Sequence, residues 1–187
     1  TTSSGIAALA AGGIASSDSQ ANGALMRVSP IGIFAAGRPH EAGLFARLDA
    51  RLTHPSDICQ SASAAYAAAI AAGIAGGNAD AMWQAAYENV GPEAAGLVLQ
   101  DRLEKSRLMP PSDYQHQMGW VLTAFQNAFY WLMKGVALET AVVSTVSAGG
   151  DTDTNAAVCG ALLGARQGRD AVPLQWRNAI LTCRPVE

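Results

Sequence analysis

The chain is poor in charge, in aromatic side chains and in cysteine. Only 14% of its 187 residues are charged and 6% are aromatic, whereas 50% are hydrophobic, with alanine prominent among them. The basic residues are scattered without a polybasic run and the formal net charge is −3. This charge pattern argues against a nucleic-acid-binding protein, which would need to neutralise phosphates. Many small and few aromatic side chains favour closely packed helices over sheets.

The three cysteines, Cys59, Cys159 and Cys183, are an odd number and lie far apart, so they define no disulfide framework. Cys159 lies in an apolar run, where a small buried side chain is expected rather than a reactive thiol. We expect a reducing, cytoplasmic location, and the first residues lack the features of a signal peptide. The apolar run 62–77 is interrupted by a tyrosine and is rich in alanine and glycine, so it predicts a buried helix and no membrane span.

Apolar residues recur at helical spacing along most of the chain, and we find no convincing strand and no internal repeat. The length suits one domain with a substantial core, so the sequence predicts a single all-α domain over residues 1–187. Pro30 is expected to end or kink the second helix. The predicted helices span residues 3–13, 24–34, 41–52, 57–75, 79–89, 92–107, 114–134, 138–147, 151–167 and 173–181.

The segment 149–158 places two carboxylates and two hydroxyls directly after a glycine pair and before an apolar run. This order is typical of a loop entering a helix, where aspartate and threonine accept hydrogen bonds from the first free N–H groups. Residues two apart do not share a helix face, but at such a junction Asp151 and Asp153 can converge on one point. Mg²⁺ and Mn²⁺ prefer all-oxygen sites of this kind. Helix capping and metal binding are therefore both open.

Four further positions have a structural and a functional interpretation. The turn at Asn22-Gly23 precedes a helix start and is either an ordinary turn or a phosphate-binding segment. Arg27 pairs with a local carboxylate or with a substrate phosphate. His54, in a Thr-His-Pro break, forms a local hydrogen bond or holds a phosphate oxygen or a ribose hydroxyl. Trp120 is a core residue or stacks on a base.

In this order, these segments resemble the ADP-ribosylglycohydrolase family, the group that includes the dinitrogenase reductase-activating glycohydrolases. The matching segments are residues 22–30, 53–55, 119–121, 149–157 and 160–165, with Val172-Pro173 and Trp176 near the end. The resemblance implies an orthogonal multi-helix all-α fold around a binuclear Mg²⁺ or Mn²⁺ site. It also implies hydrolysis of the bond that joins ADP-ribose to a protein side chain, arginine in many members.

The resemblance also implies roles for individual residues. Two cations would clamp the ribose hydroxyls and orient a water toward the anomeric carbon, and nearby carboxylates would favour an oxocarbenium-like transition state. Asp18 is the nearest candidate for the acidic residue that family members carry before the Asn-Gly pair. The implied metal ligands are Asp151, Asp153 and Thr154. The implied substrate-binding residues are Asn22, Gly23, Met26, His54, Trp120, Gly149 and Gly150.

The sequence departs from the family in one respect. Members carry an earlier half with a Thr-Asp-Asp segment that provides the other face of the metal site, whereas this chain contains no Asp-Asp pair. Half of the metal ligands would then lie outside this chain. The half that carries them is a second chain, has been removed by proteolysis, or has been lost, and the sequence leaves these three explanations open. The main hypothesis is a metal-dependent hydrolase of ADP-ribosylated protein. The alternative is a catalytically inactive, immunity-type module that binds ADP-ribose or a protein partner.

Overall fold

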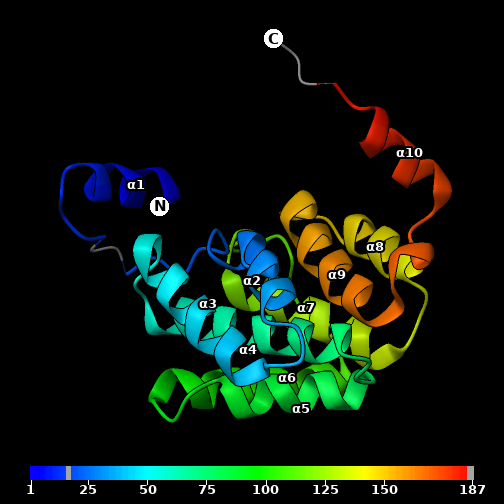
Figure 1. Ribbon diagram of the computed structural model, residues 1–187, viewed down its shortest axis with the longest axis horizontal. Helices are drawn as coiled ribbons and strands as arrows, with labels where there is room; N and C mark the ends of the chain where they lie inside the picture. The colour runs from blue at the N-terminus through cyan, green and yellow to red at the C-terminus, as the bar shows by residue number, and fades with distance from the viewer. Residues whose placement is uncertain (16–17, 185–187) are drawn as a thin grey trace.

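The computed structural model describes residues 1–15 and 18–184, and the backbone of these residues confirms the all-α prediction (Figure 1). In these ranges ten α-helices and two short 3-10 helices are joined by loops. The α-helices are α1 Thr2–Ala10, α2 Ser29–Phe34, α3 Pro39–Thr53, α4 Asp57–Ile74, α5 Ala79–Asn89, α6 Ala94–Leu108, α7 Val121–Lys134, α8 Leu138–Ser147, α9 Thr152–Gln167 and α10 Leu174–Thr182; the 3-10 helices are η1 Leu25–Arg27 and η2 Arg169–Ala171.

Three predicted helices near the N-terminus and the middle of the chain differ in extent from those observed. The segment 24–34 forms η1 and α2 rather than one helix. Pro30 lies in the first turn of α2, where its missing N–H leaves no helical hydrogen bond unmade, so it begins this helix instead of ending it. The helix predicted for residues 3–13 ends at Ala10, and the one predicted from residue 92 begins at Ala94.

The largest error concerns the aromatic helix predicted for residues 114–134, because α7 begins only at Val121. Asp113 Oδ1 accepts hydrogen bonds from the backbone N–H groups of residues 115 and 116, at 2.7 and 3.0 Å. Such a side-chain turn competes with helical hydrogen bonding. Gln117 then adopts a left-handed backbone conformation with φ of 57°, which a helix does not allow. The segment 113–120 is therefore a loop.

Helix α4 lies at the centre of the helical body and packs against α2, α3, α5, α6, α7 and α9. Its alanines let neighbouring helices approach closely. A Cβ atom at Gly32 of α2 would lie only 2.7 Å from the Ile70 Cβ, so only glycine fits at this crossing. The apolar run 62–77 is thus buried helix as far as residue 73, as predicted, whereas α4 ends at Ile74 and residues 74–76 are exposed. Across the described ranges no helix is both long and apolar enough to cross a membrane.

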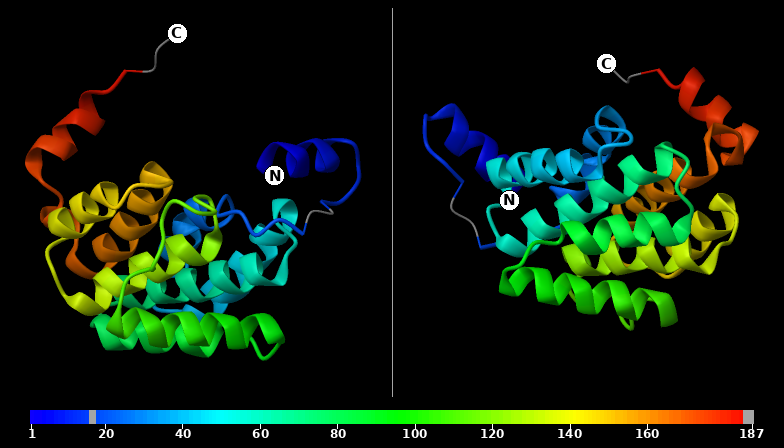
Figure 2. Two further views of the ribbon diagram at one scale, coloured as in Figure 1. Left: turned by 180° about the vertical axis from the view of Figure 1, so that it is seen from behind. Right: turned by 60° about the horizontal axis from the view of Figure 1, so that its bottom comes forward.

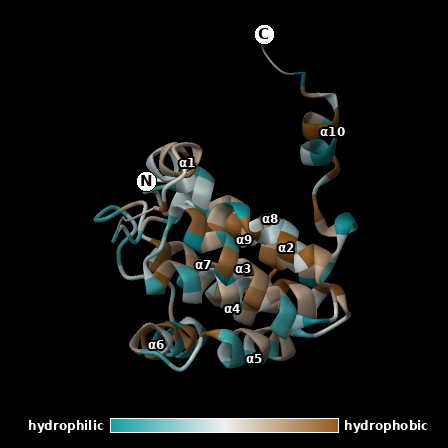
Figure 3. Cartoon of the chain, turned by 60° about the vertical axis from the view of Figure 1, so that its left-hand side comes forward, coloured by the Kyte–Doolittle hydropathy of each residue, from teal (hydrophilic) through white to brown (hydrophobic). Residues whose placement is uncertain are grey.

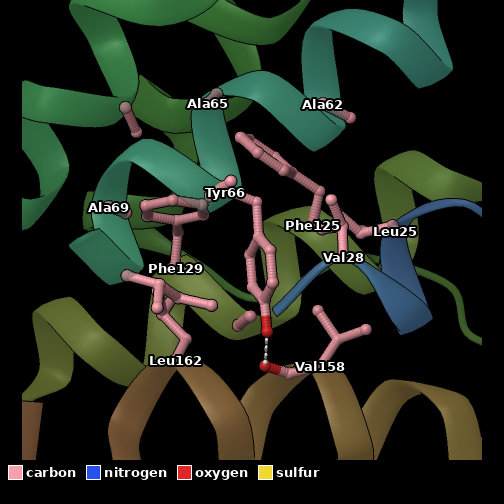
Figure 4. Close-up of a cluster of buried hydrophobic side chains, with 14 of the residues drawn as sticks. Leu25, Val28, Ala62, Ala65, Tyr66, Ala69, Phe125, Phe129, Val158 and Leu162 are labelled. Carbon is pink, nitrogen blue, oxygen red and sulfur yellow. Dashed lines mark hydrogen bonds between the residues drawn. The ribbon is translucent and has the colours of Figure 1, made fainter. Parts of the chain in front are cut away.

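The largest core side chains gather where α4, α7 and α9 meet (Figure 4). Tyr66 of α4 is fully enclosed beside Phe125 and Phe129 of α7, whose ring centroids lie 4.7 Å apart. The Tyr66 hydroxyl donates a 2.8 Å hydrogen bond to the carbonyl oxygen of Val158 in α9. This bond satisfies the one polar atom of the side chain, as a buried tyrosine requires. It also ties α9, which follows the Asp151 segment, to the central helix.

Helices α1 and α10 lie at the edges of the helical body, as two further views show (Figure 2). No residue of α10 is buried, and the helix extends away from the other helices. Colouring by hydropathy shows that α10 carries both hydrophobic and hydrophilic residues there (Figure 3). In α1 only Gly5 is buried, and it lies against Thr53 at the end of α3.

Candidate active site

Asp151 stands at the N-cap position of α9, directly after the turn formed by Gly149 and Gly150. Both glycines have positive φ angles, 81° and 72°, which β-carbon-bearing residues rarely adopt. The Asp151 side chain makes no capping hydrogen bond. The capping interpretation of this side chain is therefore wrong, although its backbone carbonyl accepts from the N–H of Asn155 at 3.0 Å. The carboxylate is left available for other contacts.

The Asp151 carboxylate meets Asn22, which is 129 residues away along the chain. Asn22 Nδ2 donates to Asp151 Oδ2 at 2.7 Å, a short bond of the kind that a charged acceptor makes. The backbone N–H of Asn22 donates to the carbonyl oxygen of Gly119 at 2.8 Å. A Cβ atom at Gly119 would in turn lie 3.8 Å from Asp151 Oδ2. Three of the segments that were predicted to contribute to the site thus converge on one carboxylate oxygen.

Asp153 and Thr154 complete a cluster of oxygen atoms in the first turn of α9. The interaction with the Asp151 carboxyl, followed by the N–H groups of Thr154 and of Asp153 itself, lowers the pKa of Asp153. The exposed Asp153 side chain is therefore ionised at neutral pH. Thr154 Oγ1 lies 3.9 Å from the sulfur of Met26, a weak contact that connects this turn to η1.

The oxygen atoms of Asp151, Asp153 and Thr154 fit a divalent cation in type but not in number. Two carboxylates and a hydroxyl are donors of the type that Mg²⁺ and Mn²⁺ prefer. Within residues 1–15 and 18–184, however, no third histidine, cysteine, aspartate or glutamate joins Asp151 and Asp153 in a group that could hold a metal ion. The donor type fits, but the described donor set is incomplete for a six-coordinate ion.

A wide-open cavity of about 610 Å³ has a lining that includes Asp18, Gln20, Gly119 and Trp120 but none of Asp151, Asp153 and Thr154. Gly119 connects it to the cluster, since a Cβ atom there would lie 3.8 Å from Asp151 Oδ2. The Trp120 indole is half-buried rather than in the core. Its Nε1 donates to Gln20 Oε1 at 2.9 Å, and the Arg102 guanidinium carbon lies 5.1 Å from its ring centroid. Asp18 is exposed on the cavity rim. Asp18, the candidate for the acidic residue before the Asn-Gly pair, and Trp120, a candidate stacking residue, therefore line the same cavity.

His54 is the one predicted substrate-binding side chain that is fully enclosed, away from the solvent-exposed side of the cluster. Its Nδ1 lies 2.9 Å from Thr53 Oγ1, and among the described residues its Nε2 has no hydrogen-bond partner. The ring packs against Gly23, where a Cβ atom would lie 2.9 Å from Nε2 and 2.7 Å from the Thr2 hydroxyl oxygen. Burial, followed by the positive charge of Arg27, lowers the pKa of His54. The histidine is neutral, and its role in substrate binding stays a prediction.

Of the two interpretations of Arg27, the structure supports pairing with a local carboxylate. Arg27 forms a salt bridge with Asp49 in which the nearest nitrogen and oxygen atoms are 3.0 Å apart, and it also donates to the Asp49 backbone carbonyl at 3.0 Å. This salt bridge links η1 to α3.

The sequence analysis missed two residues that border the site, Tyr114 and Gln115. The Tyr114 carbonyl oxygen lies against Gly150 and the Gln115 side chain lies against Gly149. Their signal was present in the sequence, since Asp113 follows two prolines and a serine and favours a turn at this position. The aromatic pattern of the following helix obscured it.

The fold and the site together define a class of protein: an all-α protein with paired aspartates and a threonine at the start of a helix that packs into the core. The chain belongs to the ADP-ribosylglycohydrolase family, because the model of that family matches residues 1–186. A solved structure described as an ADP-ribosylglycohydrolase-related protein complex has the same fold, with a TM-score of 0.75 and 25% identity over 88% of this chain and 56% of the other.

Curated relatives agree with this membership. The chain is 26% identical to the ADP-ribosyl-[dinitrogen reductase] glycohydrolase of Rhodospirillum rubrum, over 85% of this chain and 50% of the relative. It is 26% identical to human ADP-ribosylhydrolase ARH3, over 86% and 54% respectively, and 29% identical to an uncharacterized protein of Archaeoglobus fulgidus, over 84% and 52%. The chain thus spans about half the length of the curated relatives it matches.

Proposed function

We propose that this protein provides one half of a metal-dependent active site that removes ADP-ribose from a modified protein side chain, with arginine as the first candidate. One observation carries the proposal. Asn22 Nδ2 donates to Asp151 Oδ2 at 2.7 Å although the two residues are 129 positions apart, and Asp153 and Thr154 follow in the same first turn of α9. Family membership supplies the ADP-ribosyl substrate class.

In this proposal Asp151, Asp153 and Thr154 would hold Mg²⁺ or Mn²⁺, together with donors from outside the described residues. The bound cation would supply charge that orients a water and the ribose hydroxyls at the anomeric carbon. Asn22 holds one Asp151 oxygen through its amide and so restricts the rotation of the carboxylate. In this proposal the two carboxylates would also contribute negative charge that favours an oxocarbenium-like transition state.

The reaction replaces the bond from the anomeric carbon to the guanidino nitrogen by a bond to the water oxygen, and one water proton ends on the leaving nitrogen. Asp18 on the cavity rim is the candidate acid for this proton transfer. The Trp120 indole, which lines the same cavity, is the candidate platform for the adenine ring.

A reducing cytoplasm suits the three cysteines, which are all free thiols.

Given its missing half, the protein should release ADP-ribose from an ADP-ribosylated arginine substrate in the presence of Mg²⁺ or Mn²⁺, and the test measures this release alongside Mn²⁺ binding by calorimetry. Asp151→Ala and Asp153→Ala are expected to abolish both turnover and Mn²⁺ binding. Asp101→Ala is the matched control, because Asp101 is exposed on α6 and pairs only locally with Lys105 at 2.7 Å. Undiminished turnover in either site variant would disprove the metal-ligand assignment.

The incomplete donor set favours one alternative, a module that binds ADP-ribose or a protein partner without hydrolysis. Calorimetry in the presence of a chelator distinguishes the two functions. Tight ADP-ribose binding without metal, and no ADP-ribose release when Mg²⁺ or Mn²⁺ is restored, would support the binding module and contradict the hydrolase.

A further inference from the structure

The turn that leads into Asp151 rests on the loop 113–120. Gly149 and Gly150 both have left-handed backbone conformations, and neighbouring atoms occupy the positions where their β-carbons would stand. At Gly150 this neighbour is the backbone carbonyl oxygen of Tyr114, and at Gly149 it is the side-chain amide of Gln115. Since a backbone carbonyl cannot move independently of its chain, a displacement of Tyr114 would displace the turn.

A buried hydrogen-bond network holds Tyr114 in place. The Tyr114 hydroxyl donates to Asn127 Oδ1 at 2.8 Å, and Trp131 Nε1 donates to the same oxygen at 3.1 Å. Asn127 Nδ2 donates to Thr145 Oγ1 at 3.0 Å. Asn127 on α7 and Thr145 on α8 are both fully enclosed. Because Thr145 precedes Gly149 by only one helical turn, the network reaches the Gly149-Gly150 turn from its preceding helix as well as from the loop.

The Asn127 side-chain amide is the centre of this network. The Asn127 oxygen accepts from Tyr114 and Trp131 and, at 3.4 Å, lies within reach of the Thr145 hydroxyl, while its nitrogen donates to Thr145, so the buried amide is well satisfied. Burial raises the pKa of Tyr114, so its hydroxyl keeps its proton and remains a donor. Of the groups that bind Asn127, only the Tyr114 hydroxyl comes from the loop itself, since Trp131 lies on the same helix as Asn127.

We propose that Tyr114 is a positioning residue that acts through Asn127 and the Gly149-Gly150 turn to hold Asp151 and Asp153 in the geometry of the proposed metal site. Its consequence for metal binding rests on the proposed function. Its consequence for the turn itself does not, because it depends only on the contacts that Tyr114 and Gln115 make with the two glycines.

The test compares Tyr114→Phe with the unsubstituted protein by two measurements. The first is the Mn²⁺ dissociation constant, which we expect to rise about 3- to 10-fold, in keeping with the loss of one hydrogen bond that orients a ligand. The second is the NMR chemical shifts of the Gly149 and Gly150 amides in metal-free protein, which we expect to change. Unchanged shifts together with unchanged Mn²⁺ affinity would overturn the proposal.

Trp131→Phe is the matched control. It removes the other hydrogen bond to Asn127 Oδ1 but leaves the loop attached, so we expect the glycine amide shifts and the Mn²⁺ affinity to stay unchanged. An equal effect of both substitutions would show that the network only stabilises the core. Should Tyr114→Phe fail to fold, Thr145→Val probes the same network from α8, with Thr145→Ser as the conservative variant that keeps the hydroxyl.

The two proposals fail in different ways. Absence of Mn²⁺ binding in the unsubstituted protein would refute the metal site of the proposed function. The glycine amide shifts in metal-free Tyr114→Phe would still decide whether Tyr114 positions the turn.

Discussion

Replacing Gly150 by alanine would place a methyl group where the Tyr114 carbonyl oxygen lies. Two separate penalties follow. The first is conformational, because φ at this position is 72° and a left-handed backbone costs an L-residue about 1–2 kcal/mol. The second is steric, because the added carbon meets a backbone atom that a rotamer change cannot move.

Gly135 allows the two penalties to be separated. Its φ of 70° is nearly the same, but no atom outside its local helix and chain neighbours lies within 4 Å of the position of an added Cβ. Gly135→Ala should therefore lower the free energy of unfolding by the conformational penalty alone, partly offset by the reduced entropy of the unfolded chain. Gly150→Ala should lower it by about 1–3 kcal/mol more, the usual range for overpacking in a well-packed region.

Urea denaturation of both variants measures the two free energies, and thermal unfolding checks them, since each kcal/mol lowers the midpoint by about 2–4 °C in a chain of this size. The difference between the variants is the decisive quantity. Equal destabilisation of Gly150→Ala and Gly135→Ala would show that the loop 113–120 does not press on the turn, and would refute the structural basis of the positioning proposal.

Three further predictions concern the core, the thiols and the buried histidine. Leu162 is fully enclosed, so Leu162→Ala should lower the free energy of unfolding by about 2–5 kcal/mol in urea denaturation. A thiol reagent at about pH 8 should modify the exposed Cys183 in the native protein but not Cys59 or Cys159, whose pKa burial raises to about 12; three equivalents reacting without denaturant would contradict this. Burial lowers the pKa of His54 below 6.5, so the unfolded chain gains a proton more readily than the folded protein. The difference in the free energy of unfolding between the unsubstituted protein and His54→Asn should therefore be constant above pH 6.5. As the pH falls through the folded pKa, the unsubstituted protein should lose stability relative to the variant. Urea denaturation between about pH 8 and pH 5 measures both free energies.

Local signals were sufficient to predict most of the helices. Helices α5 and α8 have the predicted limits, residues 79–89 and 138–147. At α5 the cause is visible, because the Asn78 side chain accepts a 2.8 Å hydrogen bond from the N–H of Ala81 and so fixes the helix start. Such capping involves residues three apart in the chain, which a sequence pattern reveals.

The loop 113–120 could not be predicted in the same way. Its aromatic and apolar residues continue the pattern of α7 toward the N-terminus, which favours one long helix. The turn at Asp113 is a local signal, but the position of the loop also depends on contacts with Gly149 and Gly150 and on the bond from Tyr114 to Asn127. The partners on the Gly149-Gly150 turn are more than thirty residues away, and no local pattern indicates them.

The sequence by itself determined which chemical groups stand at the start of α9, since two carboxylates and a hydroxyl, those of Asp151, Asp153 and Thr154, follow a glycine pair. Only the tertiary structure decided what those side chains contact. Asp151 does not cap its own helix and instead accepts a hydrogen bond from Asn22, while His54, grouped with them by sequence, is enclosed behind Gly23. The physical reason is that these contacts depend on how α4, α7 and α9 pack, and packing joins residues whose separation along the chain leaves no periodic signal.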